Sequence, residues 1–458
     1  MPEPTAADHG PTPTDPREPL EVVIVGGGIA GAEALLALHA LAGERVSLRL
    51  VSASDRLALP ALTVAEPFAL GSAPSYPLDD LVAHADAELI LGSLAAVDRE
   101  SQEITLDDGQ RLGFHALVLA VGATAVEAVQ NATTWWPRGN PDAYGGLLRD
   151  LEEGYIKRVA FVIPPGAVWP LPAYELALMT AREVASMGID DVELTVITPE
   201  ASPLTLMGAG AATALRQELD DVGVRLRTAT VARVQRTPHL HVVLQPTTRS
   251  LQVDRVVALP EVRGLAIPGT DHDERGFIRV HDGWRMRGAE HIWAIGDAAA
   301  YPVKFGGLAT QQADQAAADI ARLTGVAVAT PDRALTLRGV LLTGSTPRAL
   351  GSQPPFNLAH RPIWRPEDKV HGHYLSTYLG LLDREPTDLK PAEDGVVMID
   401  QILPDQAGPD ELHAFWRDDN DSVARLGHAM HNYQATHAQN ASAPPRARST
   451  RPPIARSK

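Results

Sequence analysis

The chain has 458 residues, with 40 basic and 57 acidic side chains, a net charge of −17 and no cysteine. This negative charge opposes binding to nucleic acid, and the lack of cysteine excludes disulfides, thiolate metal ligands and thiol redox relays. The sequence has no apolar run of the roughly 20 residues that are needed to span a bilayer. We therefore expect a cytoplasmic protein of two or more domains.

The first 18 residues are rich in proline and acid, and they lack the basic and apolar regions of a signal peptide. We expect a disordered lead-in over 1–18. The next stretch, "EVVIVGGGIAGAEALLALHALAGERVSLRLVSAS", alternates an apolar strand, a glycine turn, an alanine-rich helix and a second strand. This pattern predicts a βαβ unit and a parallel sheet in a first domain part over 19–150.

Gly26, Gly28 and Gly31 form a G-x-G-x-x-G pattern directly after the strand expected over 21–25. In this context Gly26 allows a tight turn, Gly28 lets the backbone approach a pyrophosphate, and Gly31 lets helix and strand pack closely. The helix N-terminus adds unpaired N–H groups and partial positive charge. The pattern predicts a dinucleotide site, the alternative being only a tight turn. Ser52 stands where an acid usually binds the adenosine ribose, so we expect a weaker ribose contact.

The rest of the chain divides into four further segments. A second α/β unit is predicted over 151–262, and the sequence over 263–330 returns to the pattern of the first domain, so the second unit is inserted into the first. Residues 331–436 predict a smaller C-terminal domain with an amphipathic helix near 410–433. The basic, low-complexity stretch 437–458 is expected to be a disordered tail.

Three stretches carry a resemblance to a known family: "VIVGGGIAG", "LVLAVGA", which ends the first domain part near Gly122, and "HIWAIGDAAAYPVKFGGLATQQADQAAADIARLTG". They resemble the FAD-dependent oxidoreductases with two dinucleotide-binding domains, the pyridine nucleotide-disulfide oxidoreductase superfamily that includes sulfide:quinone oxidoreductase and type II NADH dehydrogenase. The resemblance implies an α/β fold with two Rossmann-like FAD/NAD(P)-binding domains, the second inserted in the first, and a small C-terminal α+β domain. It also implies non-covalently bound FAD.

In that family a Gly-Asp pair at the end of the late strand, here Gly296 and Asp297, binds the ribityl chain of FAD. The helix that follows points its N-terminus at the flavin pyrimidine. An alternative role for Asp297 is that of a helix N-cap. Together, the glycine pattern and the resemblance imply these cofactor-binding residues: Gly26, Gly28, Gly31, Ser52, Gly122, Gly296, Asp297, Gly307, Leu308 and Ala309.

The stretch "VIPPGAVWPLPAYELA" stands where relatives that take hydride from NADH carry a second glycine-rich loop. Proline has no N–H to offer a phosphate, and Trp169 fills the approach. We therefore expect NADH and NADPH to be poor donors. Sulfide:quinone oxidoreductases also lack this loop, but they use cysteines near the flavin, and this chain has none.

Glu175 and Lys304 are the candidate catalytic residues. The resemblance places an acid near the flavin at Glu175, where it would donate or accept a proton; the alternative is an acid that only complements the helix dipole. Lys304 precedes the flavin-facing helix and would offset negative charge on reduced flavin; the alternative is an ordinary surface lysine. No metal site is predicted, because the two histidine pairs, His371 with His373 and His428 with His431, lack a third ligand.

The sequence therefore predicts an FAD-dependent oxidoreductase without redox cysteines, with an unnamed small-molecule donor and acceptor, the acceptor being quinone-like in one version. Two alternatives stay open: an NAD(P)H dehydrogenase of the same fold, and a flavin-binding sensor or interaction protein without turnover. A homodimer and peripheral contact of the basic tail with a membrane also stay open.

Overall fold

The computed structural model describes residues 18–137, 139, 141–329, 334–337, 339–345, 347–351, 369–370, 372–382 and 396–398. The lead-in up to residue 17, the helix expected near 410–433 and the tail over 437–458 lie outside the described residues. So do three of the four histidines considered as metal ligands. The fourth, His373, is the first residue of helix α8 (His373–Leu382).

The first half of the fold is built on a five-stranded sheet with the order β20-β9-β1-β2-β5, in which every pair is parallel. Its β1 strand and α1 helix confirm the βαβ unit expected from the glycine pattern. The elements of this sheet and its helices are β1 (Leu20–Val25), α1 (Ile29–Ala42), β2 (Val46–Ser52), β5 (Ala87–Leu91), β9 (Ala116–Leu119), β20 (Ile292–Ala294) and α6 (Gly306–Leu323).

Both faces of this sheet are covered, which explains why its central strand is apolar at successive positions. Val22 and Ile24 pack with α1 and α6 on one face. Val23 and Val25 pack on the other face with residues of a three-stranded antiparallel sheet. That sheet consists of β6 (Leu94–Asp98), β7 (Glu103–Leu106) and β8 (Arg111–Gly113), and a turn that contains Asp108 and Gly109 joins its last two strands.

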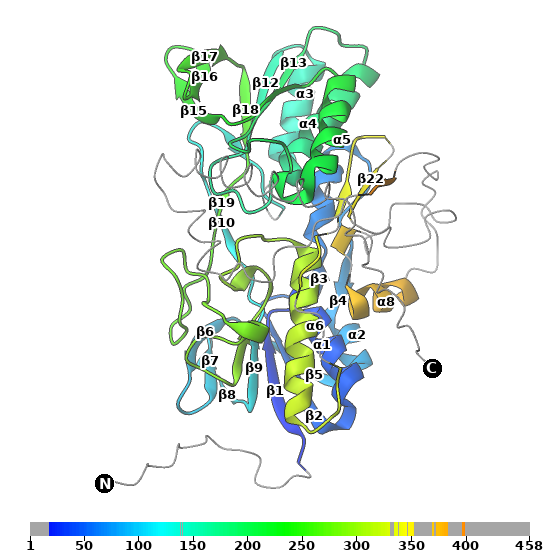
Figure 1. Cartoon of the computed structure of the whole chain (residues 1–458), viewed down its shortest axis with the longest axis vertical. Coiled ribbons are helices and arrows are strands. Elements are labelled where there is room, and N and C mark those ends of the chain that lie inside the picture. The colour runs from blue at the N-terminus through cyan, green and yellow to red at the C-terminus, as the bar shows by residue number, and fades with distance from the viewer. Residues whose placement is uncertain are drawn as a thin grey trace, which may run out of the picture.

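Shorter elements complete this half. They are η1 (Gly43–Arg45), β3 (Arg56–Ala58), η2 (Pro60–Phe68), β4 (Ser75–Pro77), α2 (Leu78–His84), η4 (Asp282–Trp284) and η5 (Gly296–Ala298). The antiparallel pair β10 (Thr124–Val126) and β19 (Glu261–Arg263) lies where the chain passes into and out of the second half (Figure 1).

The second half contains another parallel five-stranded sheet, with the order β11-β18-β12-β13-β14. Because it lies in the sequence between β9 and β20 of the first sheet, it is an insertion into the first half, as Figure 1 shows. The elements of this half are β11 (Thr133–Thr134), α3 (Pro141–Glu152), β12 (Arg158–Val162), α4 (Leu171–Ser186), β13 (Glu193–Ile197), η3 (Thr205–Met207), α5 (Gly208–Asp221), β14 (Arg225–Arg227), β15 (Val231–Arg236), β16 (Leu240–Gln245), β17 (Arg249–Gln252) and β18 (Arg255–Ala258). Of these, β15, β16 and β17 form a separate antiparallel sheet.

The described part of the C-terminal region contacts both halves. The strands β21 (Gly339–Leu341), β22 (Arg348–Gly351) and β23 (Val396–Met398) form a sheet beside α5, and α8 lies against α1 (Figure 1). The described chain has no helix with the length and hydropathy required to cross a membrane.

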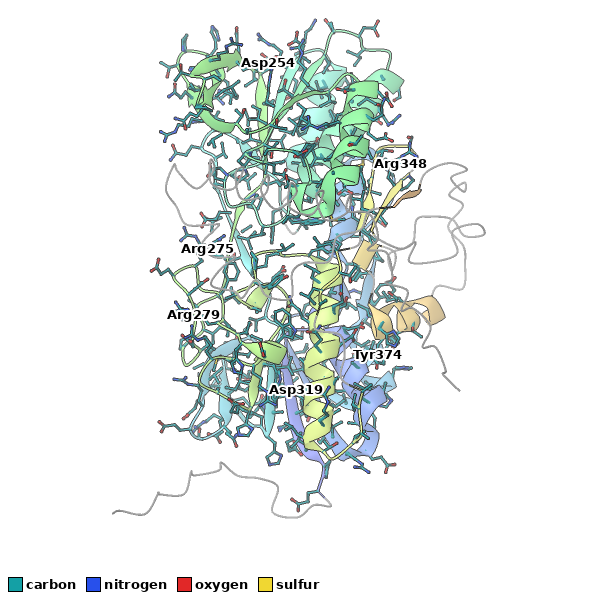
Figure 2. All side chains as sticks on the ribbon, viewed as in Figure 1. Asp254, Arg275, Arg279, Asp319, Arg348 and Tyr374 are labelled. Atoms are coloured by element: carbon teal, nitrogen blue, oxygen red, sulfur yellow. The ribbon has the colours of Figure 1, made fainter. Side chains whose placement is uncertain are left out.

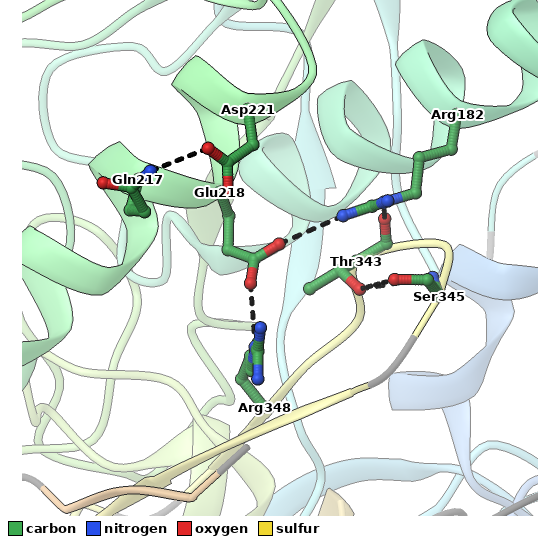
Figure 3. Close-up of polar contacts among 7 residues, drawn as sticks. All are labelled: Arg182, Gln217, Glu218, Asp221, Thr343, Ser345 and Arg348. Atoms are coloured by element: carbon green, nitrogen blue, oxygen red, sulfur yellow. Dashed lines mark hydrogen bonds and ion pairs between the residues drawn. The ribbon is translucent and has the colours of Figure 1, made fainter. Parts of the chain in front are cut away.

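A carboxylate on α5 holds the β21–β22 pair to the second half (Figure 3). Glu218 accepts a hydrogen bond from Arg182 of α4 at 3.1 Å and one from Arg348 of β22 at 2.7 Å. Arg182 also donates to the Thr343 carbonyl oxygen at 2.7 Å. The Glu218 side chain is only 9% exposed, so this cluster is shielded from water far better than an ordinary surface ion pair.

We predict that Glu218→Ala lowers the free energy of unfolding by about 1.5–3 kcal/mol, the range for hydrogen bonds to charged groups, because two guanidinium groups lose their common partner. Glu193→Ala is the matched control, since Glu193 pairs with Arg225 at a site where both side chains are more than half exposed. Its removal should change stability by less than about 0.5 kcal/mol. Urea denaturation of both variants checks this, and equal effects would contradict the role given to Glu218.

Candidate functional site

The turn between β1 and α1 has the backbone geometry that the glycine pattern predicts. Gly26 has φ of +121°, and a Cβ there would lie 2.2 Å from the Ala120 carbonyl oxygen. A Cβ at Gly31 would lie 1.8 Å from the Gly26 carbonyl oxygen. Gly28 differs, because no protein atom lies within 4 Å of where its Cβ would be. Thus Gly26 and Gly31 are required by the fold, whereas the space in front of Gly28 is left clear.

The N-terminus of α1 opens next to this clear space. Gly28 is the N-cap residue and supplies no side-chain cap, and the first turn contains no acidic residue. The first N–H groups of a helix have no intrahelical acceptor, and they favour a negative ligand. The arrangement therefore suits a phosphate group better than it suits a protein contact.

Gly296 brings the late part of the chain onto this turn. It follows β20 with φ of +65°, and a Cβ there would lie 2.9 Å from the Ala30 Cβ of α1 and 3.4 Å from the Ala309 Cβ of α6. Its N–H donates to Gln312 Oε1 at 2.7 Å. The helix α1, from early in the chain, therefore meets β20 and α6, from much later in it, at one glycine.

Asp297 lies beside this crossing, at the carboxyl edge of the parallel sheet, where open α/β sheets bind ligands. It is half-buried within η5, whose N-cap is Ile295, while α6 begins nine residues later with Phe305 as its N-cap. The alternative role of Asp297 as a helix N-cap is therefore wrong.

The first turn of α6 is the second uncapped helix N-terminus at this edge. It has no side-chain cap and no acidic residue in its first turn. Gly307, Leu308 and Ala309 are buried, and a Cβ at Gly306 would lie 3.5 Å from Ile29 Cδ1 of α1. The starts of α1 and α6 therefore lie close together, as the predicted cofactor site requires.

Ser52 and Gly122 also lie near this edge. Ser52 ends β2 and is 5% exposed; its hydroxyl donates to the Ser54 carbonyl oxygen at 2.7 Å. A Cβ at Gly27 would lie 2.5 Å from Ser52 Oγ, so Ser52 packs beneath the glycine turn. Gly122, with φ of +74°, ends the loop after β9. Asp55 is exposed in the loop beyond β2.

The proline-rich loop between β12 and α4 is held by a backbone turn and by one aromatic contact. Pro164 accepts a turn hydrogen bond from the Ala167 N–H at 3.2 Å, and Pro170 is the N-cap residue of α4. The Trp169 and Phe305 rings stack with centroids 4.5 Å apart, which attaches this loop to the segment that precedes α6. The loop thus contacts the candidate cofactor site through an aromatic pair.

Lys304 lies in the same segment. It is 8% exposed, so the alternative interpretation of Lys304 as an ordinary surface lysine is wrong. Its ammonium donates to the Ala299 carbonyl oxygen and lies 4.0 Å from the centre of the Phe277 ring. Burial lowers the pKa of Lys304 to about 7, although the Asp297 carboxylate opposes that shift. Near neutral pH this side chain therefore gains or loses a proton readily.

Glu175 lies in α4 and is 1% exposed. It accepts hydrogen bonds from Lys369 Nζ at 2.7 Å and from the Leu342 N–H at 2.9 Å. Burial raises the pKa of Glu175, against the effect of Lys369, and burial lowers the pKa of Lys369. Glu175 therefore does more than complement the dipole of α4, because it forms this buried ion pair. Sequence reasoning missed Lys369, which lies 194 residues further along.

Glu200 is a second acid that the sequence analysis missed. It lies three residues after β13, at the carboxyl edge where a dinucleotide domain places its ribose-binding acid. Tyr174, in the first turn of α4, donates its hydroxyl to Glu200 at 2.6 Å, and the Thr198 hydroxyl and the Thr205 N–H also donate to it. The signal that would have revealed it was an acid shortly after β13, the strand that follows α4 in the inserted unit.

Comparison with known proteins adds relatives to this geometry. A ferredoxin reductase component of chlorobenzene dioxygenase from Cupriavidus sp. (strain PS12) is 27% identical over 301 residues, which are 62% of this chain and 68% of that protein. The sulfide:quinone oxidoreductase structure from Aquifex aeolicus has a TM-score of 0.64 at 18% identity and covers 82% of this chain and 98% of its own. The ferredoxin reductase of the CYP199A2 system from Rhodopseudomonas palustris has a TM-score of 0.52 at 20% identity, covering 71% and 80%.

These structural neighbours share the fold with two nucleotide-type sheets. The pyridine nucleotide-disulphide oxidoreductase family matches residues 20–319, which extend from the start of β1 into α6 and include both parallel sheets. The chain is an oxidoreductase that belongs to the pyridine nucleotide-disulphide oxidoreductase family.

Proposed function

We propose that the protein binds FAD non-covalently and passes electrons through it between a small-molecule donor other than NAD(P)H and a separate acceptor, without redox cysteines. The observation that carries the proposal is the crossing at Gly296, where the starts of α1 and α6 meet the end of β20. A dinucleotide with a flavin at one end suits a site that offers two uncapped helix N-termini and an acid along one sheet edge.

The residues present fit FAD in three respects. The clear space at Gly28 and the uncapped α1 suit a pyrophosphate. The Asp297 carboxylate suits ribityl hydroxyls as a charged acceptor. The buried first turn of α6 suits the electronegative edge of a flavin ring. Ser52 offers the ribose only a neutral hydroxyl that already donates to Ser54, so the contact at this end is weaker than a carboxylate would make.

FAD bound at this edge would supply reversible uptake of two electrons. The chain's own contribution is electrostatic. Lys304 and the N-terminus of α6 place positive charge beside the edge, which favours an added negative charge. Because the pKa of Lys304 is about 7, a nearby negative charge would draw a proton onto its amine.

The buried pair of Glu175 and Lys369 is the best-placed group for a proton transfer step. Its two charges are hydrogen-bonded at 2.7 Å in a site closed to water, so moving the proton from the ammonium to the carboxylate leaves a neutral pair. A proton moves within this pair without leaving an isolated buried charge, whereas a proton taken up from the donor would give the pair a net positive charge, which the negative charge of the added electrons would offset. We assign it the role of accepting a proton from the donor or returning one to the acceptor.

A second candidate function, NADH oxidation, is favoured by one observation, the acid Glu200 at the ribose position of the inserted unit. Two features oppose it. The Glu200 carboxylate already accepts a hydrogen bond from the Tyr174 hydroxyl. In addition, the prolines of the loop after β12 lack the N–H donors that a pyrophosphate needs. We therefore expect the inserted unit to lack a working dinucleotide site.

The partners that we propose are small electron carriers, on the pattern of relatives named as ferredoxin reductases and as sulfide:quinone oxidoreductase. We also propose that the protein is cytoplasmic and that its domains have the boundaries predicted from the sequence.

Gly28→Val should weaken FAD binding by at least about 100-fold, or about 2.8 kcal/mol, because its side chain would fill the space needed by the pyrophosphate. The protein has room for this side chain, so thermal stability without added FAD should be unchanged. Gly31→Ala is the contrasting variant, since its Cβ would collide with the Gly26 carbonyl group and lower stability itself. Fluorescence titration with FAD measures the affinities, and unchanged binding by Gly28→Val would contradict the site.

Lys304→Met should lower the midpoint potential of the bound flavin, since the variant keeps the apolar stem but removes the charge. A loss of about 1.4 kcal/mol corresponds to roughly 30 mV for a two-electron couple. Because Lys304 is charged mainly below its pKa of about 7, the difference from wild type should be larger at acidic than at alkaline pH. Potentiometric titration at several pH values checks this, and a difference independent of pH would contradict the role of Lys304.

NADH and NADPH should reduce the bound flavin only at millimolar concentrations. Losing a few charge-assisted hydrogen bonds of about 1.5–3 kcal/mol each raises a micromolar dissociation constant to that range. Glu200→Gln should leave the reduction unchanged, because Glu200 is occupied by Tyr174. Rapid-mixing measurements that saturate at micromolar NADH, with a loss in Glu200→Gln, would establish the dehydrogenase instead.

A further inference from the structure

Helix α6, which begins at the proposed cofactor site, carries two adjacent glutamines, Gln311 and Gln312. Gln312 is 2% exposed. Its Oε1 accepts the Gly296 N–H at 2.7 Å, and Gly296 directly precedes Asp297 in the chain. The Gln312 side chain therefore fixes the backbone beside the acid that we assign to the ribityl hydroxyls.

The strand that leads to Gly296 is attached to the same helix at a second point. Asp319, which Figure 2 labels on α6, lies about two turns beyond Gln312, so the two side chains share one face of the helix. Its Oδ2 accepts a hydrogen bond from Trp293 Nε1 of β20 at 3.0 Å. The end of β20 is thus held to α6 on both sides of the turn into η5, and α6 determines where Asp297 lies.

The bond to Gly296 also fixes the orientation of the Gln312 amide. A backbone N–H needs an acceptor, so the amide atom that faces Gly296 is the oxygen, and Nε2 is turned away from the Gly296 nitrogen. A primary amide nitrogen carries two N–H donors. Within the described part of the chain, Nε2 of Gln312 has no hydrogen-bond acceptor. A side chain that is almost completely buried therefore leaves its donors unused.

Gln311, the preceding residue, shows the contrasting case. Its Nε2 donates to the Gly307 carbonyl oxygen at 2.6 Å and to the Thr336 carbonyl oxygen at 2.9 Å, and its Oε1 accepts the Thr336 N–H at 2.8 Å. The protein itself thus satisfies both ends of the Gln311 amide. It satisfies only the oxygen of Gln312, although a buried N–H without an acceptor is unfavourable. The difference points to a ligand as the acceptor for Gln312.

Gln312 belongs to the contact that carries the proposed function. Ala309, almost one turn before Gln312 on α6, has its Cβ 3.4 Å from where a Gly296 Cβ would be, and the Ala30 Cβ of α1 lies 2.9 Å from the same point. Its hydrogen bond therefore ends at the glycine where both uncapped helix N-termini meet β20. The unused donors lie at the sheet edge to which we assign the dinucleotide.

We propose that Gln312 is a further residue of the cofactor site, whose Oε1 positions Gly296 and Asp297 and whose Nε2 donates to an acceptor oxygen of the bound dinucleotide. That oxygen belongs to a ribityl hydroxyl or to a phosphate, and both accept hydrogen bonds from a neutral amide. An amide suits the position better than a carboxylate, which would accept the same Gly296 N–H but would offer negative charge to the ligand. The inference rests on the proposed function and adds a residue that neither the glycine pattern nor the family resemblance indicated.

The direct test is NMR of the glutamine side-chain amides in the purified full chain, labelled with nitrogen-15 at glutamine and titrated with FAD. The Gln312 signals, assigned by their absence in Gln312→Glu, should shift downfield, and their protons should exchange with water at least about tenfold more slowly in the complex. The Gln311 signals serve as the internal control and should not change, because the Gln311 donors are already bonded to carbonyl oxygens.

The absorbance of bound FAD, recorded in the same titration, separates the two possible failures. Uptake of FAD with unchanged Gln312 signals would overturn the inference and leave the proposed function standing. Failure to take up FAD would contradict the proposed function and the inference with it. Because the wild-type chain is measured, this test does not depend on how any variant folds.

Adenosine diphosphate distinguishes the two sources of the acceptor oxygen, since it carries the phosphates of FAD without the ribityl chain. A shift of the Gln312 signals with adenosine diphosphate would support a phosphate oxygen as the acceptor. A shift with FAD alone would support a ribityl hydroxyl.

Two variants separate the roles of the two ends of the amide. Gln312→Glu keeps an acceptor for the Gly296 N–H but has no N–H donors, so FAD should bind at least about tenfold more weakly while the Gly296 amide keeps its wild-type protection from hydrogen exchange. Gln312→Met removes both ends, so the Gly296 amide should also lose protection in the protein without FAD. A residue that acted only through Gly296 would be rescued by Gln312→Glu, and wild-type FAD affinity in that variant would overturn the role of Nε2.

Discussion

The close approach of α1, the end of β20 and α6 at Gly296 is the contact on which the proposed site depends. Any side chain at Gly296 would meet Ala30 at 2.9 Å, so the helices can cross here only because the residue is glycine and its neighbours are alanines. The crossing sets both helix N-termini beside one sheet edge, and both lack a side-chain cap. The fold thereby leaves unsatisfied N–H groups together where a dinucleotide can satisfy them.

Three buried acids show how the rest of the chain is attached to this centre. Glu33 receives the first turn of α8, Glu175 pairs with Lys369, and Glu218 holds β22 through Arg348. Each acid lies on a helix of one of the two halves, and each partner lies in the C-terminal region. Since an unpaired buried charge costs several kcal/mol, these contacts specify how that region docks more sharply than apolar packing does.

The parts of the structure that were predictable from the sequence are those determined by local pattern. Examples are the strand, glycine turn and helix around Gly26–Gly31, the Gly296-Asp297 pair before α6 and the proline loop after β12. In each of these stretches, the residues that suggest a function lie within a few positions of the strand or helix that positions them. The charge partners were not predictable, because Glu175 and Lys369 are 194 residues apart and no periodicity connects them. Lys304 illustrates the same limit, since its burial depends on Phe277 and Ala299 and not on its neighbours in sequence alone.

The visible absorption spectrum of the purified protein, recorded before and after addition of FAD, tests the central claim most directly. The account predicts that the protein either carries the flavin bands as isolated or takes up added FAD in a one-to-one ratio. The bands should bleach with dithionite and return in air. A colourless protein that fails to take up added FAD would contradict the claim that the edge around Gly296 is a flavin site.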